Sequence, residues 1–229
     1  HVLFSSFLRM TAPFFPRGIG LLGGTFDPVH TGHLAIAREA IRQLKLLRVD
    51  FVPAPAPWQK NVLTPLNLRL AMLEAAVSDH PEFGINLTDV LREGATYTID
   101  TVRDLRNAVG TSLPLILLIG QDQWVNFHTW KDWTRLTDYV SIAVCSRGTA
   151  KGAPTEAVKV WAEERLTAPE IVNEVPHGKI TFFSMPEHAA SSTKIRTLFA
   201  EAGRREALRR LSAWLPAPTA ALIARRNIY

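Results

Sequence analysis

The chain has 229 residues, of which 47% are hydrophobic, and it contains a single cysteine, Cys145. This composition provides an apolar core and excludes a disordered chain, while one cysteine excludes an intramolecular disulfide framework and a cysteine-cluster metal site. It fits a reducing cytoplasm, which is the location we expect. The longest strongly apolar run, LPLILLIG at 113–120, is far shorter than the roughly 20 residues of a membrane-spanning helix, so no membrane association is expected.

The net charge of +5 is concentrated near the end of the chain, where eight Lys or Arg stand against two Glu from Lys194 onward. A basic segment can indicate nucleic-acid binding. No aromatic residues alternate with these arginines as a base-stacking surface would require, so we interpret them as exposed helix faces and expect no specific nucleic-acid partner. Residues 1–16 are predicted to be a partly disordered extension, and 17–229 a single domain.

Apolar, β-branched runs alternate with segments of helical periodicity along the chain. The runs predict strands at 18–23, 48–53, 84–88, 114–120, 139–145 and 179–183. The periodic segments predict helices at 31–45, 65–79, 98–108, 154–165, 193–201, 203–210 and 217–226. This alternation predicts an α/β fold with a doubly wound parallel sheet, helices on both faces and a small helical portion from about residue 191. The ligand site should then lie at the carboxyl ends of the strands.

The first predicted strand is joined to the first helix by GGTFDPVHTGH, residues 23–33. Gly23 and Gly24 allow a ligand to approach the backbone closely, and Thr31 can cap the helix. His30 and His33 lie one turn apart at the helix start, where free N–H groups and a partial positive charge suit a phosphate. Zinc ligation and a purely structural role are the alternatives for the two histidines.

A second motif, AASSTKIR at 189–196, precedes the helical end of the chain. Ser191 or Ser192 can cap the helix that follows, and its free N–H groups can bind a phosphate oxygen. Arg196 supplies a permanently charged, forked donor for a polyphosphate. Taken alone, the same residues are more typical of a capped surface helix.

Together, GGTFDPVHTGH and AASSTKIR resemble the GxFDPxHxGH and [IV]SSTxIR signatures of the HxGH nucleotidyltransferases, with Ala190 where isoleucine is usual. That resemblance implies a Rossmann-like fold and transfer of a nucleoside monophosphate from a nucleoside triphosphate with release of pyrophosphate. It implies that both histidines contact the triphosphate.

The middle and the end of the chain are similar to the bacterial nicotinate-nucleotide adenylyltransferase family in particular. The similarity runs from about residue 18 to the end and is carried by ATYTIDTV (95–102), LIGQDQW (118–124), FHTW (127–130), VCSRG (144–148) and the closing LPAPTAALIARRNIY. It implies adenylyl transfer from ATP to nicotinate mononucleotide, which gives deamido-NAD in NAD biosynthesis.

The resemblance also implies roles for individual residues. The catalytic set is His30, His33 and Arg196. ATP is expected to contact Gly24, Thr25, Phe26, His30, His33, Gly120, Asp122, Ser191, Ser192, Thr193 and Arg196. Nicotinate mononucleotide is expected to contact Gly23, Gly24, Thr25, Lys60, Thr96, Tyr97, Thr98, Trp130 and Arg147. Mg²⁺ is expected to arrive with ATP, because no carboxylate cage for a metal is visible.

Several of these residues also have a simpler interpretation. Asp122 follows a buried strand and could bind ribose or cap a turn, and Trp130 could stack on a pyridine ring or fill the core. Tyr97 and Thr98 begin a predicted helix whose N–H groups could bind the nicotinate carboxylate. Lys60 matches a phosphate-binding position of the family, but Gln59 stands where the family often has histidine.

Three alternative functions stay open. The enzyme could accept nicotinamide mononucleotide, alone or with the acid, and it could act on phosphopantetheine, although ATYT and FHTW argue against that acceptor. A nucleotide- or RNA-binding protein without catalysis would not need both histidines together with Arg196. The sequence does not predict an oligomeric state.

Overall fold

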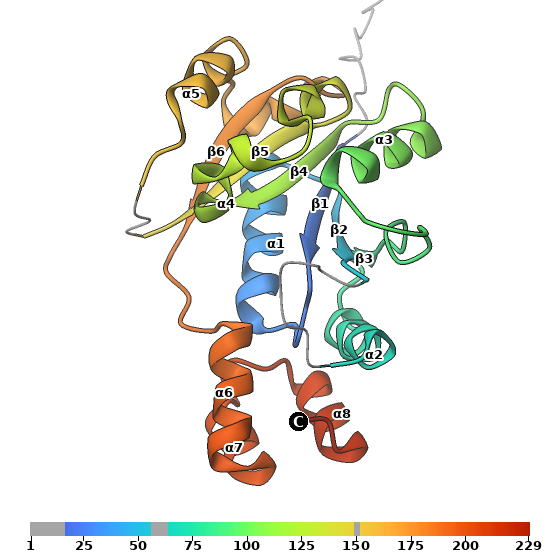
Figure 1. Cartoon of the computed structure of the whole chain (residues 1–229), viewed down its shortest axis with the longest axis vertical. Helices are drawn as coiled ribbons and strands as arrows, with labels where there is room; N and C mark the ends of the chain where they lie inside the picture. Colours follow the sequence, from blue (N-terminus) through green and yellow to red (C-terminus); the bar gives the residue numbers. More distant parts are fainter. Residues whose placement is uncertain (1–16, 56–63, 149–151) are drawn as a thin grey trace, which may run out of the picture.

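The computed structural model describes residues 17–55, 64–148 and 152–229. The predicted disorder of residues 1–16 and the role of Lys60 lie outside these ranges. Six parallel strands form one sheet in the order β3-β2-β1-β4-β5-β6 (Figure 1). Their bounds are β1 Ile19–Gly24, β2 Arg48–Pro53, β3 Phe83–Ile85, β4 Leu115–Gly120, β5 Ser141–Arg147 and β6 Ile180–Met185. The predicted Rossmann-like, doubly wound fold is confirmed, and the strand order reverses direction between β1 and β4.

Eight α-helices and three 3₁₀-helices (η) connect and follow the strands in the described ranges. The α-helices are α1 Thr31–Leu44, α2 Leu66–Val77, α3 Thr98–Val109, α4 Gln121–Val125, α5 Glu156–Glu163, α6 Ser192–Ala202, α7 Arg204–Arg210 and α8 Ala217–Arg226. The 3₁₀-helices are η1 Phe127–Thr129, η2 Trp133–Asp138 and η3 Pro169–Glu174. Every α-helix predicted from the sequence is present. The sequence missed α4 and the 3₁₀-helices because a helix of one or two turns is too short to show a hydrophobic period.

The predicted strand at 84–88 is the least accurate boundary, since β3 spans only Phe83–Ile85. Asn86 still donates its N–H to the Phe51 carbonyl of β2 at 2.8 Å, but its side chain accepts a hydrogen bond from the Thr88 N–H at 3.0 Å, which begins a turn. The chain then runs without regular structure to Tyr97. This irregular segment brings Asp89 and Thr96 to the carboxyl edge of the sheet, where they line the site.

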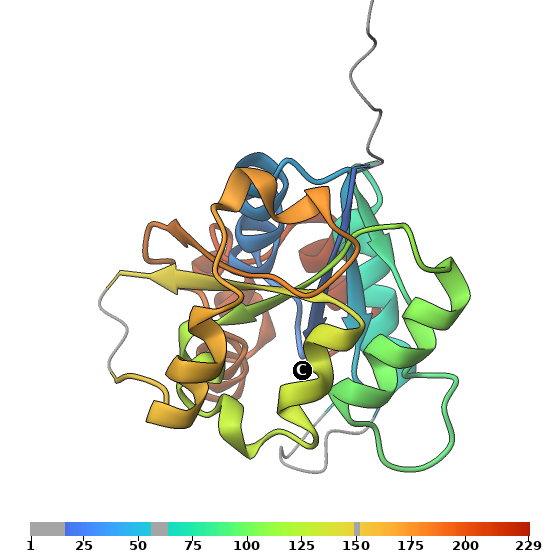
Figure 2. The same ribbon diagram turned by 90° about the horizontal axis from the view of Figure 1, so that it is seen from above.

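The sheet separates two apolar cores. One core contains residues of α1, α2 and α6–α8, and the other contains residues of α3, α5 and the short helices after β4. Figure 2 shows α1 and α3 on opposite sides of the sheet. All six residues of β4, LILLIG, are buried, as expected for a central parallel strand covered on both faces.

The helical end of the chain packs beside α2 and below the carboxyl end of β1 (Figure 1). A buried hydrogen bond joins α8 to α2, because the Thr219 hydroxyl donates to the Met72 carbonyl at 3.0 Å. No helix in the three described ranges is both long and apolar enough to cross a bilayer. The last three helices therefore extend the core around α1 and α2.

Candidate functional site

Two cavities adjoin each other at the carboxyl ends of β1 and β4, where the strand order reverses. The α3 cavity has a volume of about 260 Å³ and is lined on one side by residues of α3 and the segment before it. The α6 cavity has a volume of about 540 Å³ and is lined by residues of β5, α1 and α6. Both are lined by Gly23, Gly24, Thr25, Ile119 and Gln123. A ligand in one cavity would therefore lie next to a ligand in the other.

Gly23 and Gly24 lie at the end of β1, as the sequence motif predicts. A Cβ at Gly23 would meet no atom of the described chain within 4 Å, so this face of the backbone is open to a ligand. A Cβ at Gly24 would lie 2.9 Å from the ring of Phe26. Phe26 itself has a positive φ of 50° and is buried, which turns the chain sharply toward α1.

His30 and His33 form a reciprocal cap at the start of α1. The Nδ1 atom of His30 accepts a hydrogen bond from the Gly32 N–H at 3.1 Å, and the Nδ1 atom of His33 accepts one from the His30 N–H at 3.2 Å. Because each Nδ1 is an acceptor, the proton of each neutral ring must sit on Nε2. The rings stack with centroids 3.8 Å apart. The pair thus presents Nε2–H donors.

The expected cap by Thr31 is wrong. Its hydroxyl donates instead to the carbonyls of Ala213 and Trp214, at 3.0 and 3.2 Å, and so ties α1 to the segment before α8. Thr31 is already the first residue of the helix, whereas a capping side chain must belong to the extended residue before it. His30 occupies that position, with φ −142° and ψ 170°.

Burial keeps His30 neutral. Desolvation first, and then the neighbouring His188 and Arg147, lower the pKa of His30 to about 3. The described residues that line the α6 cavity include His33 but not His30, which is only 4% exposed. His33 is therefore the histidine placed to contact a ligand in the cavity, and His30 lies behind it.

The second motif forms the opposite wall of the α6 cavity. Ser191 is the N-cap of α6 and accepts from the Lys194 N–H at 3.2 Å, while the Ser192 hydroxyl donates to the Pro28 carbonyl at 2.9 Å. Arg196 donates to the Asp27 carbonyl at 2.7 Å. Ser192, Thr193 and Arg196 line the cavity, whereas Ser191 is not among its described lining residues.

Gly120, Asp122 and Arg147 complete the α6 cavity. A Cβ at residue 120 would lie 2.6 Å from the Asp122 carboxylate, which explains the glycine before the acidic residue. Arg147, expected at the mononucleotide, lines this cavity together with the residues expected to bind ATP. Burial raises the pKa of the Cys145 thiol to about 11, so this lining residue is not a nucleophile near neutral pH.

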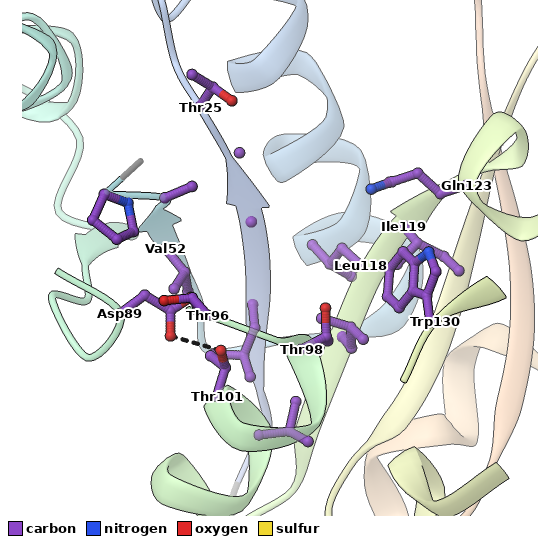
Figure 3. A pocket seen from close by; sticks show the side chains of 17 residues that line it. Thr25, Val52, Asp89, Thr96, Thr98, Thr101, Leu118, Ile119, Gln123 and Trp130 are labelled. Atoms are coloured by element: carbon purple, nitrogen blue, oxygen red, sulfur yellow. Dashed lines mark hydrogen bonds between the residues drawn. The ribbon is translucent and has the colours of Figure 1, made fainter. Parts of the chain in front are cut away.

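The α3 cavity has an aromatic wall and a hydroxyl-rich wall. In Figure 3, Trp130 and Gln123 lie on one side of the cavity, and Asp89 and Thr96 lie on the other, above the start of α3. The Oγ1 atom of Thr96 is buried and has no hydrogen-bond partner in the part of the chain that the structure describes. A buried hydroxyl without a partner is costly, so this atom suits a polar ligand group.

Tyr97 and Thr98 lie at the start of a helix, as the sequence predicts. Tyr97 is the N-cap of α3 and Thr98 is its first residue. Thr98 lines the α3 cavity, but the described lining residues do not include Tyr97, whose ring lies 4.5 Å from the Lys131 Nζ. Its contribution to the site is therefore the backbone at the start of the helix.

Sequence reasoning missed three polar residues of the α3 cavity, Asp89, Thr101 and Gln123. Asp89 is buried and accepts from the Thr101 hydroxyl at 2.6 Å and from Arg92 at 2.8 Å. The signal for Gln123 was its place in LIGQDQW, where its side chain accepts from the Gly120 N–H at 2.9 Å. No sequence motif contains Asp89. It reaches the cavity because β3 ends earlier than predicted, which the sequence pattern did not reveal.

A comparison with protein families matches residues 21–198 to a family described as cytidylyltransferase-like. The probable nicotinate-nucleotide adenylyltransferase of Bordetella pertussis is 37% identical over 212 residues, which cover 92% of this chain and 97% of the relative. The probable nicotinate-nucleotide adenylyltransferase of Neisseria meningitidis serogroup C is 39% identical over 182 residues, which cover 79% of this chain and 87% of the relative.

Solved structures support the same fold. Plasmodium falciparum nicotinic acid mononucleotide adenylyltransferase complexed with NaAD aligns with a TM-score of 0.69 at 16% identity and covers 93% of this chain. Its complex with APC aligns with a TM-score of 0.68. From the family match and the identity to full-length relatives, the chain belongs to the cytidylyltransferase-like family and, within it, to the nicotinate-nucleotide adenylyltransferases.

Proposed function

We propose that the protein transfers the adenylyl group of ATP to nicotinate mononucleotide. A 5′-phosphate oxygen of the mononucleotide forms a bond to the α-phosphorus of ATP, and the bond from that phosphorus to the bridging oxygen of the β-phosphate breaks. The electron pair leaves with pyrophosphate, and the other product is deamido-NAD. The relatives named for this activity support the proposal.

The observation that carries the proposal is the meeting of two cavities over Gly23, Gly24 and Thr25. Two nucleotides bound from opposite sides would direct their phosphates toward this shared backbone. Such an arrangement favours direct transfer between them, because holding two reactants in line supplies much of the catalytic effect. A single-substrate hydrolase would not need the second cavity.

The α3 cavity suits the nicotinate half of the acceptor. Trp130 offers a flat surface on which a pyridine ring can stack. The backbone N–H groups at the start of α3, beside Thr98, suit a carboxylate. The buried hydroxyl of Thr96 adds a further donor within the same cavity. We assign Lys60 to the acceptor phosphate from the family resemblance.

The α6 cavity suits the triphosphate of ATP. His33, Arg147 and Arg196 supply donors or positive charge on its walls, with His30 behind His33. Gly120 and Asp122, at the end of β4, lie where ribose hydroxyls could be accepted. Fixed donors of this kind stabilise the charge that develops on a leaving pyrophosphate.

Mg²⁺ is the metal we assign to the reaction, bound with the phosphates of ATP. The described residues contain no group of three or more His, Cys, Asp or Glu side chains that could hold a metal. Mg²⁺ commonly takes most of its ligands from substrate phosphates and water, so it would not require such a group of side chains. When bound, the metal neutralises charge on the phosphates. We place the enzyme in the cytoplasm, where ATP is available.

The protein itself needs neither a general base nor a covalent intermediate. A phosphate monoester has a second pKa of about 6, so the attacking oxygen is already ionised near neutral pH. The residues of the two cavities bind and orient the reactants. The neutral His33 ring donates from Nε2 while its Nδ1 stays occupied by the His30 backbone.

The first experiment measures pyrophosphate release with ATP, Mg²⁺ and either nicotinate or nicotinamide mononucleotide. We expect a strong preference for the nicotinate form, and a decrease in kcat/KM of about 10²–10³-fold in His33→Ala, the scale for losing one transition-state donor. His80→Ala is the matched control, because His80 lies before β3 and pairs with Glu82 at 3.4 Å.

Equal rates with the two mononucleotides would instead indicate dual specificity. No pyrophosphate release with either acceptor would overturn the proposed reaction. Steep, salt-dependent binding of oligonucleotides in that case would favour the alternative of a non-catalytic RNA-binding protein.

A further inference from the structure

The loop of residues 25–28 is the first part of the connection from β1 to α1 and forms part of the α6 cavity. Its backbone carbonyls are held from two sides. Arg69 of α2 donates to the Thr25 carbonyl at 2.8 Å, and Arg196 of α6 donates to the Asp27 carbonyl at 2.7 Å. The conformation of this loop therefore depends on helices that are distant in the sequence.

Asp27 is the buried acidic residue of the loop, with a relative exposure of 2%. A buried carboxylate needs hydrogen bonds to offset the loss of water. The Tyr229 hydroxyl donates to its Oδ1 atom at 2.6 Å, across a separation of 202 residues. This contact ties the loop to the segment after α8.

Tyr229 is itself held firmly. Its ring stacks on Phe199 of α6 with centroids 5.0 Å apart and an interplanar angle of 20°. Arg204, at the start of α7, donates to the Tyr229 carbonyl at 2.9 Å and to the Asn227 side chain at 2.8 Å. Burial, together with the bond to Asp27, raises the pKa of the Tyr229 phenol, so the hydroxyl remains a donor at physiological pH.

We propose that Tyr229 is a positioning residue for catalysis, which sets the 25–28 loop through its hydrogen bond to Asp27. The proposal rests on the adenylyl-transfer function. Thr25, Phe26 and Asp27 line the α6 cavity, and His30, the cap of α1, follows two residues after the loop ends. A loop that moves would displace the backbone donors from a bound triphosphate, and small misplacements reduce turnover strongly.

The test is Tyr229→Phe, which removes the hydroxyl and keeps the ring on Phe199. We expect kcat to fall roughly 10- to 100-fold, the range for a small misplacement of reacting groups, with an almost unchanged KM for nicotinate mononucleotide. Tyr139→Phe is the matched control, because its hydroxyl is involved only in a 3.5 Å contact with the exposed Arg135 among the described residues. This control should keep wild-type kinetics.

Two further measurements separate this proposal from the proposed function. Amide hydrogen exchange of residues 25–33 should become about tenfold faster in Tyr229→Phe, as expected for losing one hydrogen bond to a charged group, whether or not the protein releases pyrophosphate. In an Asp27→Ala background, Tyr229→Phe should have no additional effect on kcat. Unchanged exchange in the loop, or the same decrease in kcat in both backgrounds, would overturn the role of Tyr229.

Discussion

At the scale of single residues, the spacing of His30 and His33 has a second consequence besides bringing two imidazoles to a phosphate. Residues three apart at a helix start are the N-cap and N3 positions, so each ring can bind a backbone N–H of the first turn. The hydrogen bonds at 3.1 and 3.2 Å fix both tautomers. The same two side chains therefore stabilise the helix and prepare Nε2–H donors.

The depressed pKa of His30 predicts a pH-dependent stability. The pKa of His30 is lowered to about 3 in the native protein, whereas the ordinary pKa of a histidine, which applies to the unfolded chain, is 6.5. The unfolded chain therefore binds more protons between these values, and the free energy of unfolding should fall as the pH drops below 6.5, by at most about 1.4 kcal/mol per pH unit from this group.

Urea unfolding of the wild type and of His30→Asn, compared at pH 7 and pH 4.5, tests this expectation. Asparagine can still cap α1 but does not titrate, so the variant should lose less stability over this range. Contributions to the pH dependence that the two proteins share cancel in the comparison. Parallel pH curves for the two proteins would show that His30 is not buried in its neutral form.

At the scale of elements, the two adjacent serines at the start of α6 have different roles. Ser191 caps the helix, and Ser192 binds the Pro28 carbonyl of the loop that lines the α6 cavity. The sequence indicated that one of the two serines caps α6. Only the geometry distinguishes them, because a cap needs the extended backbone found at Ser191, with φ −144° and ψ 146°.

This division predicts different effects of two alanine substitutions. Ser191→Ala should lower the free energy of unfolding by about 1 kcal/mol, the usual cost of losing an N-cap, with kcat/KM nearly unchanged. Ser192→Ala should lower kcat/KM roughly tenfold, because a hydrogen bond that supports the loop is lost. Denaturant unfolding and steady-state kinetics on both variants provide the measurement, and each serves as the control for the other. Interchanged effects would contradict the assignment.

At the scale of the whole molecule, the sheet order creates the site. The strand order reverses between β1 and β4, so the two carboxyl ends open a crevice with one cavity on each side. The residues around Trp130 belong to the core of α3 and the short helices, whereas Arg147 and Arg196 line the α6 cavity. Donor and acceptor are thereby expected on opposite sides of Gly23 and Gly24.

This separation predicts that substitutions in one cavity affect one substrate. Trp130→Leu should raise the KM for nicotinate mononucleotide roughly tenfold or more, the scale of a lost stacking contact, and leave the KM for ATP nearly unchanged. Arg147→Ala should raise the KM for ATP and leave the KM for nicotinate mononucleotide nearly unchanged. Trp133→Leu is the control, because Trp133 packs in the same core, 5.8 Å from Phe127, and is not among the described residues lining the α3 cavity. Equal changes in both KM values would contradict the separation.

The sequence by itself determined the elements and the motifs, because both depend on neighbours a few residues apart. Buried strands such as LILLIG, the helical period of α1 and the glycine-to-histidine spacing after β1 are all local patterns. Together with the family signatures they were sufficient to predict the α/β fold and most residues of the α6 cavity.

Only the tertiary structure decided how these pieces meet. Strand order depends on which runs pair at long range, and the early end of β3, which brings Asp89 to Thr101, depends on a turn that hydrophobic periodicity does not reveal. The capping role of His30 follows from backbone angles rather than residue type, since sequence alone favoured Thr31. The bond from Tyr229 to Asp27 depends on packing across 202 residues, a separation over which no local pattern acts.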